Sequence, residues 1–301
     1  MKSFVFIGPG GLPVNPPEMK AGKRQFKKNA LHKGREPMAY EEVKIQKPVM
    51  LAILPVISVM GFFIIWELII DFGLVPRSML ESPLEVIKLF LVKLSQSDPD
   101  GATWDVHAWT SIKEAFTGYL LSLLIGIPLG LLMGWFRVFE GLARPVFEML
   151  RPIPSIAWIP LTIYWFGIGL SGKVFIITMA GFIPCVINSF YGVKMTHPTL
   201  IQMARTYGAS DWTIFTRICI PSALPMVFGA LQISLATCWT TLVAAELIAA
   251  DTGLGFLITM GRKLTLPGLV VLGMVSVGLT GAFIGVIIDM VERRLLAGIR
   301  R

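Results

Sequence analysis

The chain has 301 residues, of which 54% are hydrophobic and 15% are charged. An ordinary soluble domain is about 25% charged, and a soluble protein this apolar could not keep its surface free of large apolar patches. The composition therefore excludes an ordinary soluble protein and indicates a membrane protein. In that class the net charge of +8 is first a signal of orientation in the membrane, not of nucleic-acid binding.

The first 48 residues differ from the rest of the chain. They hold ten lysines and arginines against four acidic residues, together with six prolines. This composition predicts a basic, mostly disordered cytoplasmic tail with no specific partner, although a patch that binds anionic lipid is an alternative. Residues 49–301 form the predicted membrane domain.

Six apolar stretches follow, and each approaches the roughly 20 residues that a spanning helix needs. They cover residues 49–70, 116–136, 145–167, 174–193, 222–249 and 267–289. Three prolines interrupt the third stretch, which either crosses the membrane or begins as an interfacial segment. We predict an all-α membrane protein with about six transmembrane helices.

The basic residues predict the orientation of these helices. Twenty of the 27 lysines and arginines fall in 1–48, 137–151, 194–221 and the C-terminal end, and only seven fall in the segments between. The positive-inside rule then places both termini in the cytoplasm, with an even number of spans.

One segment on the predicted outer side has a helix signal of its own. In "SPLE", Ser82 is the expected N-cap, Pro83 takes the first helical position and Glu85 completes a capping box. In the span that follows, Gly118, Gly126, Gly130 and Gly134 recur at multiples of four, which predicts close packing against another helix.

Two catalytic motifs are nearly matched in "GIGLSGKV", residues 167–174. The phosphate-binding pattern G-x-x-x-x-G-K-[ST] ends here on Val174, which supplies no hydroxyl for magnesium. "GLSG" resembles the serine motif of rhomboid intramembrane proteases, but none of His32, His107 and His197 falls in a predicted span to act as the base for Ser171. We therefore expect neither a nucleotide site nor a protease.

The inner loop at about 195–221 combines amphipathic helix signals with a bend. His197 or Thr196 can cap a helix that begins at Pro198, and Gly208 fits the left-handed position after its end. Ser210 can cap a second short helix. The expected apolar faces are Leu200, Met203, Ala204 and Tyr207 in the first helix, and Trp212, Phe215 and Ile218 in the second, with Pro221 closing the loop.

The spacing of Ala204, Gly208, Ile218 and Pro221 resembles the inner-loop signature of permease subunits of bacterial ABC importers. That signature reads E-A-A, three residues, G, nine residues, I-x-L-P. This sequence differs from it at three positions, which are Gln202, Met203 and Ile220. "RPIPSIAWIPLTIYWFGIG" (151–169) and "TTLVAAELIAADTGLGF" (240–256) are similar to the nitrate, sulfonate and taurine branch of that family. The resemblance covers about residues 50–295, and Glu114 stands where this branch usually carries arginine.

The resemblance implies a type I ABC importer permease fold and a transport subunit that is not itself an enzyme. Two copies would form the pathway in the bacterial inner membrane, with two ATPase subunits, which hold the ATP and magnesium, and an extracytoplasmic solute-binding protein. The chain itself would carry no cofactor or metal and bind no nucleic acid, and membrane lipid would surround it. The residues that would contact the ATPase subunit are Ala204, Arg205, Tyr207, Gly208, Ala209, Ser210 and Trp212.

Polar residues in the spans are candidates for the translocation pathway, because a charge at the bilayer centre costs about 2.5–3.5 kcal/mol on insertion scales. Glu246 is either a gate residue or a packing partner. Ser234, Thr237 and Thr241 share one helix face and either line the pathway or bond back to their own helix. Arg151 is expected at the inner interface, where it pairs with Glu148 or lipid phosphate, or presents charge to a departing anion.

The function predicted from these features is ATP-driven import of a small sulfonate such as taurine. The near alternative is the same machine for nitrate or bicarbonate. A secondary transporter driven by an ion gradient is a different class, which would be expected to show an inverted repeat and paired intramembrane acids.

Overall fold

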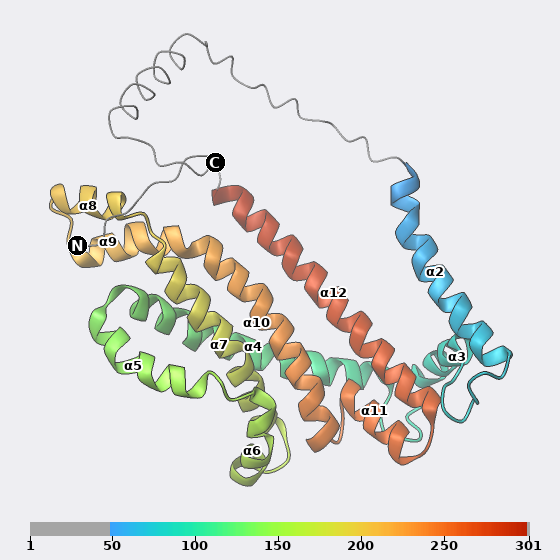
Figure 1. The fold of residues 1–301 in the computed structure, drawn as a ribbon. Coiled ribbons are helices and arrows are strands. Elements are labelled where there is room, and N and C mark those ends of the chain that lie inside the picture. The colour runs from blue at the N-terminus through green and yellow to red at the C-terminus, as the bar shows by residue number, and fades with distance from the viewer. Residues whose placement is uncertain (1–48, 300–301) are drawn as a thin grey trace, which may run out of the picture. The chain divides into compact units, whose positions relative to one another are not determined.

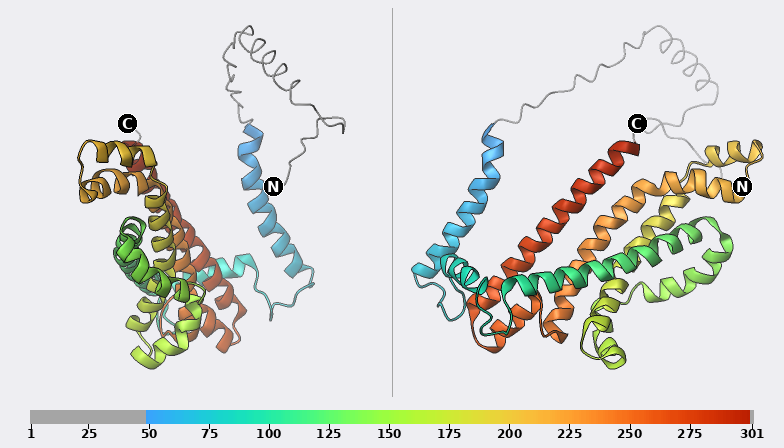
Figure 2. Two further views of the ribbon diagram at one scale, coloured as in Figure 1. Left: turned by 60° about the vertical axis from the view of Figure 1, so that its left-hand side comes forward. Right: turned by 180° about the vertical axis from the view of Figure 1, so that it is seen from behind.

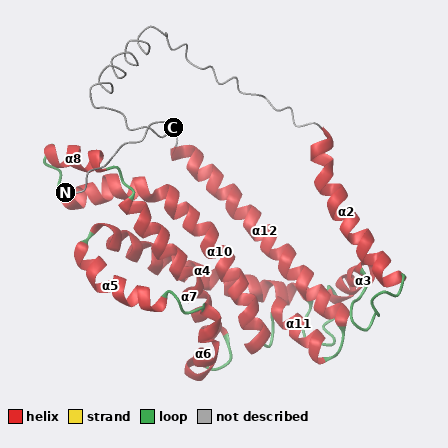
Figure 3. Ribbon diagram, viewed as in Figure 1, coloured by secondary structure: helices red, strands yellow, loops and turns green. Residues whose placement is uncertain are grey.

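The computed structural model describes residues 49–299, and within this range every regular element is helical (Figure 3). The predicted tail at 1–48 lies outside the described residues. The N-terminal unit ends at Ser58, and the arrangement described below is that of the second unit, which begins at Val59. Figure 1 labels the α-helices. Their bounds are α2 Val49–Asp71, α3 Pro83–Lys93, α4 Trp104–Trp135, α5 Arg137–Leu150, α6 Ile159–Phe166, α7 Leu170–Lys194, α8 Pro198–Thr206, α9 Asp211–Ile214, α10 Ile220–Ala249, α11 Leu254–Lys263 and α12 Pro267–Ile299. Two short elements complete the order, the 3₁₀ helix η1 Ser155–Trp158 before α6 and the π-helix η2 Phe215–Cys219 before α10.

Five of the described helical stretches are long and apolar enough to cross a membrane. They begin with Ile53–Asp71 and Trp104–Trp135, continue with Leu170–Lys194 and Asp211–Lys263, and end with Pro267–Met290. This confirms the predicted all-α membrane protein. The third predicted span, at 145–167, is not one continuous helix, because the chain leaves the α-helical path after Leu150.

Helices α4 and α7 pack closely and run parallel to each other. A Cβ atom added to Gly118 would lie 2.5 Å from Cγ2 of Ile177, and one added to Gly130 would lie 2.5 Å from the carbonyl oxygen of Val186. Gly126 and Gly134 meet α7 in the same way, so the predicted glycine face is confirmed as a packing surface.

The interrupted segment α5–η1–α6 runs antiparallel to α7 and covers its whole length. At one end, Lys194 donates a hydrogen bond to Glu140 at 2.9 Å. At the other end the rings of Phe166 and Phe175 lie with their centroids 5.7 Å apart. The segment therefore contacts both ends of α7, although its backbone is broken near the two prolines of "RPIP" and none of its described helices is long enough to span a membrane.

Helix α10 returns antiparallel to α7, and α12 packs against α10. Gly181 of α7 lies beside the side chains of Ser234 and Cys238 on α10. Trp239 covers Gly281 of α12, and its Nε1 donates to the carbonyl of Val277 at 3.2 Å. In both views of Figure 2, α6 and α11 lie at one end of this bundle, and α8 and α9 lie at the other.

Two local predictions have different outcomes. The Oγ atom of Ser82 accepts a hydrogen bond from the N–H of Glu85 at 3.3 Å, so α3 begins as the sequence predicts. Helix α4, however, begins at Trp104, well before the predicted start at 116. His107 therefore lies in a spanning helix, which corrects the prediction that none of the histidines does.

Candidate functional site

The α8–α9 loop is bent by the residues that the sequence singles out. Nδ1 of His197 accepts a hydrogen bond from the N–H of Thr199 at 3.3 Å, which caps α8. Gly208 has φ of +78°, the left-handed conformation that favours glycine after a helix end. Ser210 then caps α9 by accepting from the N–H of Thr213 at 3.3 Å. The predicted pair of short helices is confirmed.

One side of this loop is fixed to the ends of the long helices. Ile201, Ala204 and Ala209 pack against a buried cluster that joins α7, α9 and α10. The ring of Trp212 stacks against Phe136, which follows α4, with the centroids 6.4 Å apart. A force applied to the loop therefore acts directly on α4, α7 and α10.

The other side of the loop is exposed. Tyr207 is 86% exposed and Trp212 is 62% exposed, and Leu200 and Met203 also face outward. Of the apolar face predicted for the first helix, only Ala204 packs into the core, because the helix turns Ile201 inward instead. Exposed aromatic side chains and methionine on a rigid support are typical of a protein-binding surface.

An ion pair braces the bend. Arg205 of α8 and Asp211 of α9 lie 3.2 Å apart across Gly208 and Ala209. Both side chains are exposed, so the pair contributes little to stability. The pair links the two short helices across the bend, and all seven predicted ATPase-contact residues lie in the segment from Ala204 to Trp212.

The prediction that Pro221 closes the loop is wrong. It lies in the first turn of α10, and the chain runs from α9 into α10 through the π-helix Phe215–Cys219. Proline has no N–H to donate to the carbonyl four residues earlier, and the N–H of Ile220 bonds instead to the carbonyl of Phe215, five residues earlier. The loop and α10 are thus one connected helical lever.

The hydroxyl groups predicted to line a pathway lie inside the helix packing. Ser234 is buried, donates to the carbonyl of Gly181 at 3.1 Å and lies 3.2 Å from Oγ of Ser122. Thr237 bonds to carbonyls of its own helix, at 2.9 and 3.1 Å. Thr241 is buried and shares a hydrogen bond with Ser155 at 3.1 Å. These contacts favour the packing alternative for Ser234 and Thr237.

Glu246 caps the start of α11. Its Oε2 accepts from the N–H of Gly255 at 2.8 Å, and its Oε1 accepts from the hydroxyl of Ser111 at 2.6 Å. Ser111 in turn accepts from the N–H of Leu254 at 2.8 Å, and Nδ1 of His107 accepts from the N–H of Gly253 at 3.0 Å. Three successive N–H groups are therefore satisfied by buried side chains, which favours the packing role of Glu246.

A buried charged group extends this cap towards α3. Lys93 pairs with Asp100 and also donates to the carbonyl of Ala102 at 2.9 Å, and the other oxygen of Asp100 lies 2.7 Å from Nε2 of His107 in a bent contact. The sequence analysis misses His107 and Ser111 because it predicts the second span to begin at 116, and it misses Lys93 and Asp100 because their contact depends on the path of the loop between α3 and α4. The pattern His107, Ser111, Glu114 at i, i+4, i+7 could have shown a polar helix face.

The lysine of the near-match to a phosphate-binding loop is already engaged. Lys173 is buried in the first turn of α7 and pairs with Glu114 of α4. The pair agrees with the expectation that this segment is not a nucleotide site. It also gives Glu114 a role that does not depend on the arginine that resembling permeases carry there.

Arg151 lies at the end of α5, beside the middle of α7. It follows α5 directly, and its N–H bonds to the carbonyl of Phe147 at 2.8 Å. The ring of Phe147 packs on that of Phe182, which is twelve residues from each end of α7. The Arg151 end of α5 therefore lies beside the central part of α7, and the guanidinium lies 3.9 Å from Glu148, which is one of the pairings that the sequence predicts. The position of Arg151 at the inner interface stays a prediction.

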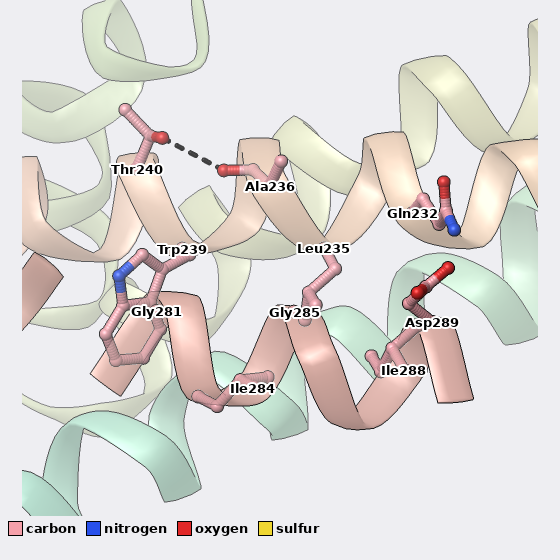
Figure 4. A pocket seen from close by; sticks show the side chains of 10 residues that line it. All are labelled: Gln232, Leu235, Ala236, Trp239, Thr240, Gly281, Ile284, Gly285, Ile288 and Asp289. Carbon is pink, nitrogen blue, oxygen red and sulfur yellow. Dashed lines mark hydrogen bonds between the residues drawn. The ribbon is translucent and has the colours of Figure 1, made fainter. Parts of the chain in front are cut away.

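A groove between α10 and α12 has a volume of about 500 Å³. Figure 4 shows Gln232 and Asp289 at one end of it and Trp239 and Thr240 at the other. The hydroxyl of Thr240 bonds to the carbonyl of Ala236 at 2.9 Å. Polar side chains on α10 thus face this groove, whereas Ser234 and Thr241 face the packed interior. Among the side chains that the structure describes, no cluster of three or more His, Cys, Asp and Glu could hold a metal ion.

A protein of this kind, a helical membrane bundle with an exposed bent loop at one end, matches a known family. The family model for binding-protein-dependent transport system inner membrane components matches residues 126–301. The chain belongs to this family and is a membrane-embedded transport component.

Similar proteins in the family carry names for different solutes. The chain is 34% identical to a probable ABC transporter permease of Brucella melitensis, over 76% of this chain and 90% of that one. It is 32% identical to the taurine transport system permease TauC of Escherichia coli, over 77% of this chain and 84% of that one. It is 28% identical to the bicarbonate transport system permease CmpB of Synechocystis, over 75% of this chain and 82% of that one.

The fold has also been seen in a solved structure. A chain of the MetNI methionine ABC transporter, in an inward-facing conformation, superposes with a TM-score of 0.53 and 20% sequence identity. The match covers 72% of this chain and all but 1% of that chain. The predicted fold class is thereby confirmed.

Proposed function

We propose that this chain is the permease subunit of an ATP-driven importer, and that the α8–α9 loop is the surface through which a separate ATPase subunit drives it. The observation that carries the proposal is the loop itself. It presents Tyr207 and Trp212 outward, while Ile201, Ala204 and Ala209 anchor it to the bundle. A loop serving only to connect helices has no need for exposed aromatic side chains on a braced support.

The geometry supports a mechanism by rigid coupling. Movement of an ATPase subunit would shift the exposed face of α8 and α9, and the buried cluster would carry that shift to the ends of α7 and α10. Because α9, the π-helix and α10 are continuous, the displacement would reach Ala249 at the opposite end of the bundle. Alternation between outward and inward openings is then the expected response.

The complete machine would hold two copies of this permease, two ATPase subunits that bind ATP and magnesium, and a solute-binding protein at the end opposite α8. In this proposal the α8–α9 end faces the cytoplasm and both termini lie there, in the inner membrane of a bacterium. The excess of lysine and arginine in the segments at that end supports this orientation.

The solute we propose is a small sulfonate such as taurine, which is supported by the likeness to the taurine permease. Bicarbonate is the second candidate, because a relative of nearly equal coverage is named for it. Nitrate is a third small anion compatible with the same branch.

The test compares two pairs of exposed aromatic residues. Tyr207→Ala with Trp212→Ala should abolish co-purification of the ATPase subunit and reduce ATP-dependent uptake into proteoliposomes. Tyr164→Ala with Trp165→Ala, which removes two exposed aromatic residues from α6 at the other end, should leave co-purification unchanged. Equal retention of the ATPase subunit by both double variants would contradict the coupling surface.

A further inference from the structure

The chain places an arginine and an acid at mid-depth of the bundle. The Phe147–Phe182 contact sets the depth of this part of α5, because Phe182 is central in the 25-residue helix α7. Glu148 is adjacent to Phe147, and Arg151 lies one turn further along. The side chains of Arg151 and Glu148 are both about half exposed on the single chain.

Such a surface cannot face lipid. Charged side chains at the bilayer centre pair with protein groups or line a water-filled cavity. The backbone between Leu150 and Ser155 is not helical, and irregular backbone at this depth is tolerated only where it is buried in protein or lines an aqueous space. Two independent features thus exclude lipid from the same face of the molecule.

Hydroxyl groups lie at the far end of this break. Ser155 begins the 3₁₀ helix four residues after Arg151, and its Oγ lies 3.1 Å from Oγ1 of Thr241 on α10. The hydrogen bond ties the break to the helix that continues from the coupling loop. A displacement of α10 would therefore move the hydroxyl end of the break relative to Arg151.

We propose that the break from Arg151 to Ser155 is an oxyanion contact site in the solute pathway, with the Arg151 guanidinium supplying the charge and Ser155, held in place by the buried Thr241, supplying a hydroxyl group. This rests on the proposed function and specifies where its solute passes. Guanidinium groups bind planar and tetrahedral oxyanions through paired N–H donors, which suits a sulfonate or bicarbonate. Interrupted helices at mid-membrane are also where transporters commonly bind their solutes.

The test measures water access and local potential without reference to any solute. Ser155→Cys is placed in the complete permease–ATPase complex in proteoliposomes and treated with an anionic and a cationic methanethiosulfonate reagent of similar size. The native cysteines are all buried, and the unsubstituted complex gives the background. Leu124→Cys is the lipid-facing control, since Leu124 is 71% exposed on α4 and lies close to the level of Gly126, which meets Cys185 near the middle of α7.

Both reagents should label Ser155→Cys, and neither should label Leu124→Cys above background. Adding Arg151→Gln should lower the anionic-to-cationic rate ratio at Ser155→Cys by about tenfold, the effect of one unscreened charge acting over several ångströms. Arg144→Gln is the control for the charge. Arg144 also lies on α5, where it donates to Glu140, the residue that also binds Lys194 at the end of α7. Its removal should leave the anionic-to-cationic rate ratio unchanged. Two results would overturn the proposed site. The first is no labelling of Ser155→Cys, which is expected if a second permease copy covers the break. The second is an anionic-to-cationic rate ratio that Arg151→Gln does not change.

Uptake of radiolabelled taurine and of radiolabelled bicarbonate separates this inference from the proposed function. Arg151→Gln should raise the half-saturating concentration of the transported anion. Arg151→Lys, which keeps the positive charge, should raise it less. If the unsubstituted complex takes up neither probe, the proposed solutes are wrong whatever the labelling shows. If uptake is normal in Arg151→Gln and the labelling ratio does not change, the contact site alone is wrong.

Discussion

The α10–α11 turn and the α8–α9 loop solve the same problem of unpaired helix ends in opposite ways. At the α10–α11 turn, the side chains of His107 and Ser111 from α4 and of Glu246 from α10 accept hydrogen bonds from three successive N–H groups. At the α8–α9 loop, the caps are local, and the aromatic side chains are left exposed. The first region is satisfied by side chains of this chain, whereas the second presents the exposed surface that we propose binds the ATPase subunit.

The comparison predicts that substitutions at the two regions fail differently, and Glu246→Ala should have the largest effect. It leaves the N–H of Gly255 and the hydroxyl of Ser111 without their acceptor in a buried site, and each such group costs about 1–3 kcal/mol. Thermal unfolding of the purified complex in detergent should show the loss.

Glu246→Gln is the matched control, because its amide oxygen retains one acceptor and the expected loss is smaller. An Ala variant that unfolds at the same temperature as the unsubstituted protein would show that the cap adds nothing to stability.

Packing of α4 on α7 gives the next largest effect. Gly130→Ala would place Cβ 2.5 Å from the carbonyl oxygen of Val186, and such overpacking typically costs about 1–3 kcal/mol. Gly141→Ala in α5 meets no atom within 4 Å and should be neutral or stabilising by up to about 1 kcal/mol, because alanine favours the helix interior. Comparable unfolding temperatures for the two variants would argue against close packing along the glycine face.

Gly208→Val should affect transport more than stability. A β-branched residue in the left-handed conformation costs about 1–2 kcal/mol, and no neighbouring atom obstructs the added side chain. We expect the bend to change shape, so that ATP hydrolysis by the complex continues while uptake falls severalfold.

Gly208→Asn tests whether the backbone conformation is responsible, because asparagine adopts the left-handed region more readily than other residues. Gly208→Asn should keep most of the uptake that Gly208→Val loses. Equal impairment of the two variants would contradict the claim that the left-handed bend at this position is needed for transport.

The smallest effect concerns pH at the end of the bundle near α8. Lys194 and Arg144 hydrogen-bond to Glu140 and lower the pKa of its carboxyl below the ordinary value. A lowered pKa stabilises the folded state above the unfolded pKa of about 4.3, and this contribution is lost as the pH falls through the lower folded value. The Glu140 carboxyl is only partly buried and both of its partners are exposed to water, so the contribution is small.

Unfolding measured between pH 6 and pH 3 checks this sign. Glu140→Gln should lose slightly less stability over that range than the unsubstituted protein, and a variant that loses more would reverse the assignment.

Local signals predicted some of this structure well. The caps at Ser82, His197 and Ser210, the bend at Gly208 and the glycine face of α4 depend on neighbours in sequence or on helix periodicity. Such features are determined within one or two helical turns, so that the sequence alone is sufficient to find them.

Features that depend on distant elements were predicted poorly. The polar first turns of α4 look like a loop, and only their contacts with α11 and with Asp100 explain why His107 and Ser111 are helical and buried. The position of Arg151 beside the middle of α7 likewise follows from α5 running antiparallel to α7, which no local pattern reveals. The pathway residues remain a prediction for the same reason, since a second copy of the chain would complete the pathway.

Reconstitution with and without the ATPase subunit tests the central claim most directly. Proteoliposomes that contain this chain, its ATPase subunit and the solute-binding protein should accumulate radiolabelled taurine or bicarbonate only when ATP is supplied on the α8–α9 side. Proteoliposomes that contain this chain without the ATPase subunit should show no uptake above that of empty vesicles. Concentrative uptake by the chain alone would contradict the account, because the α8–α9 loop would then not be where energy enters the bundle.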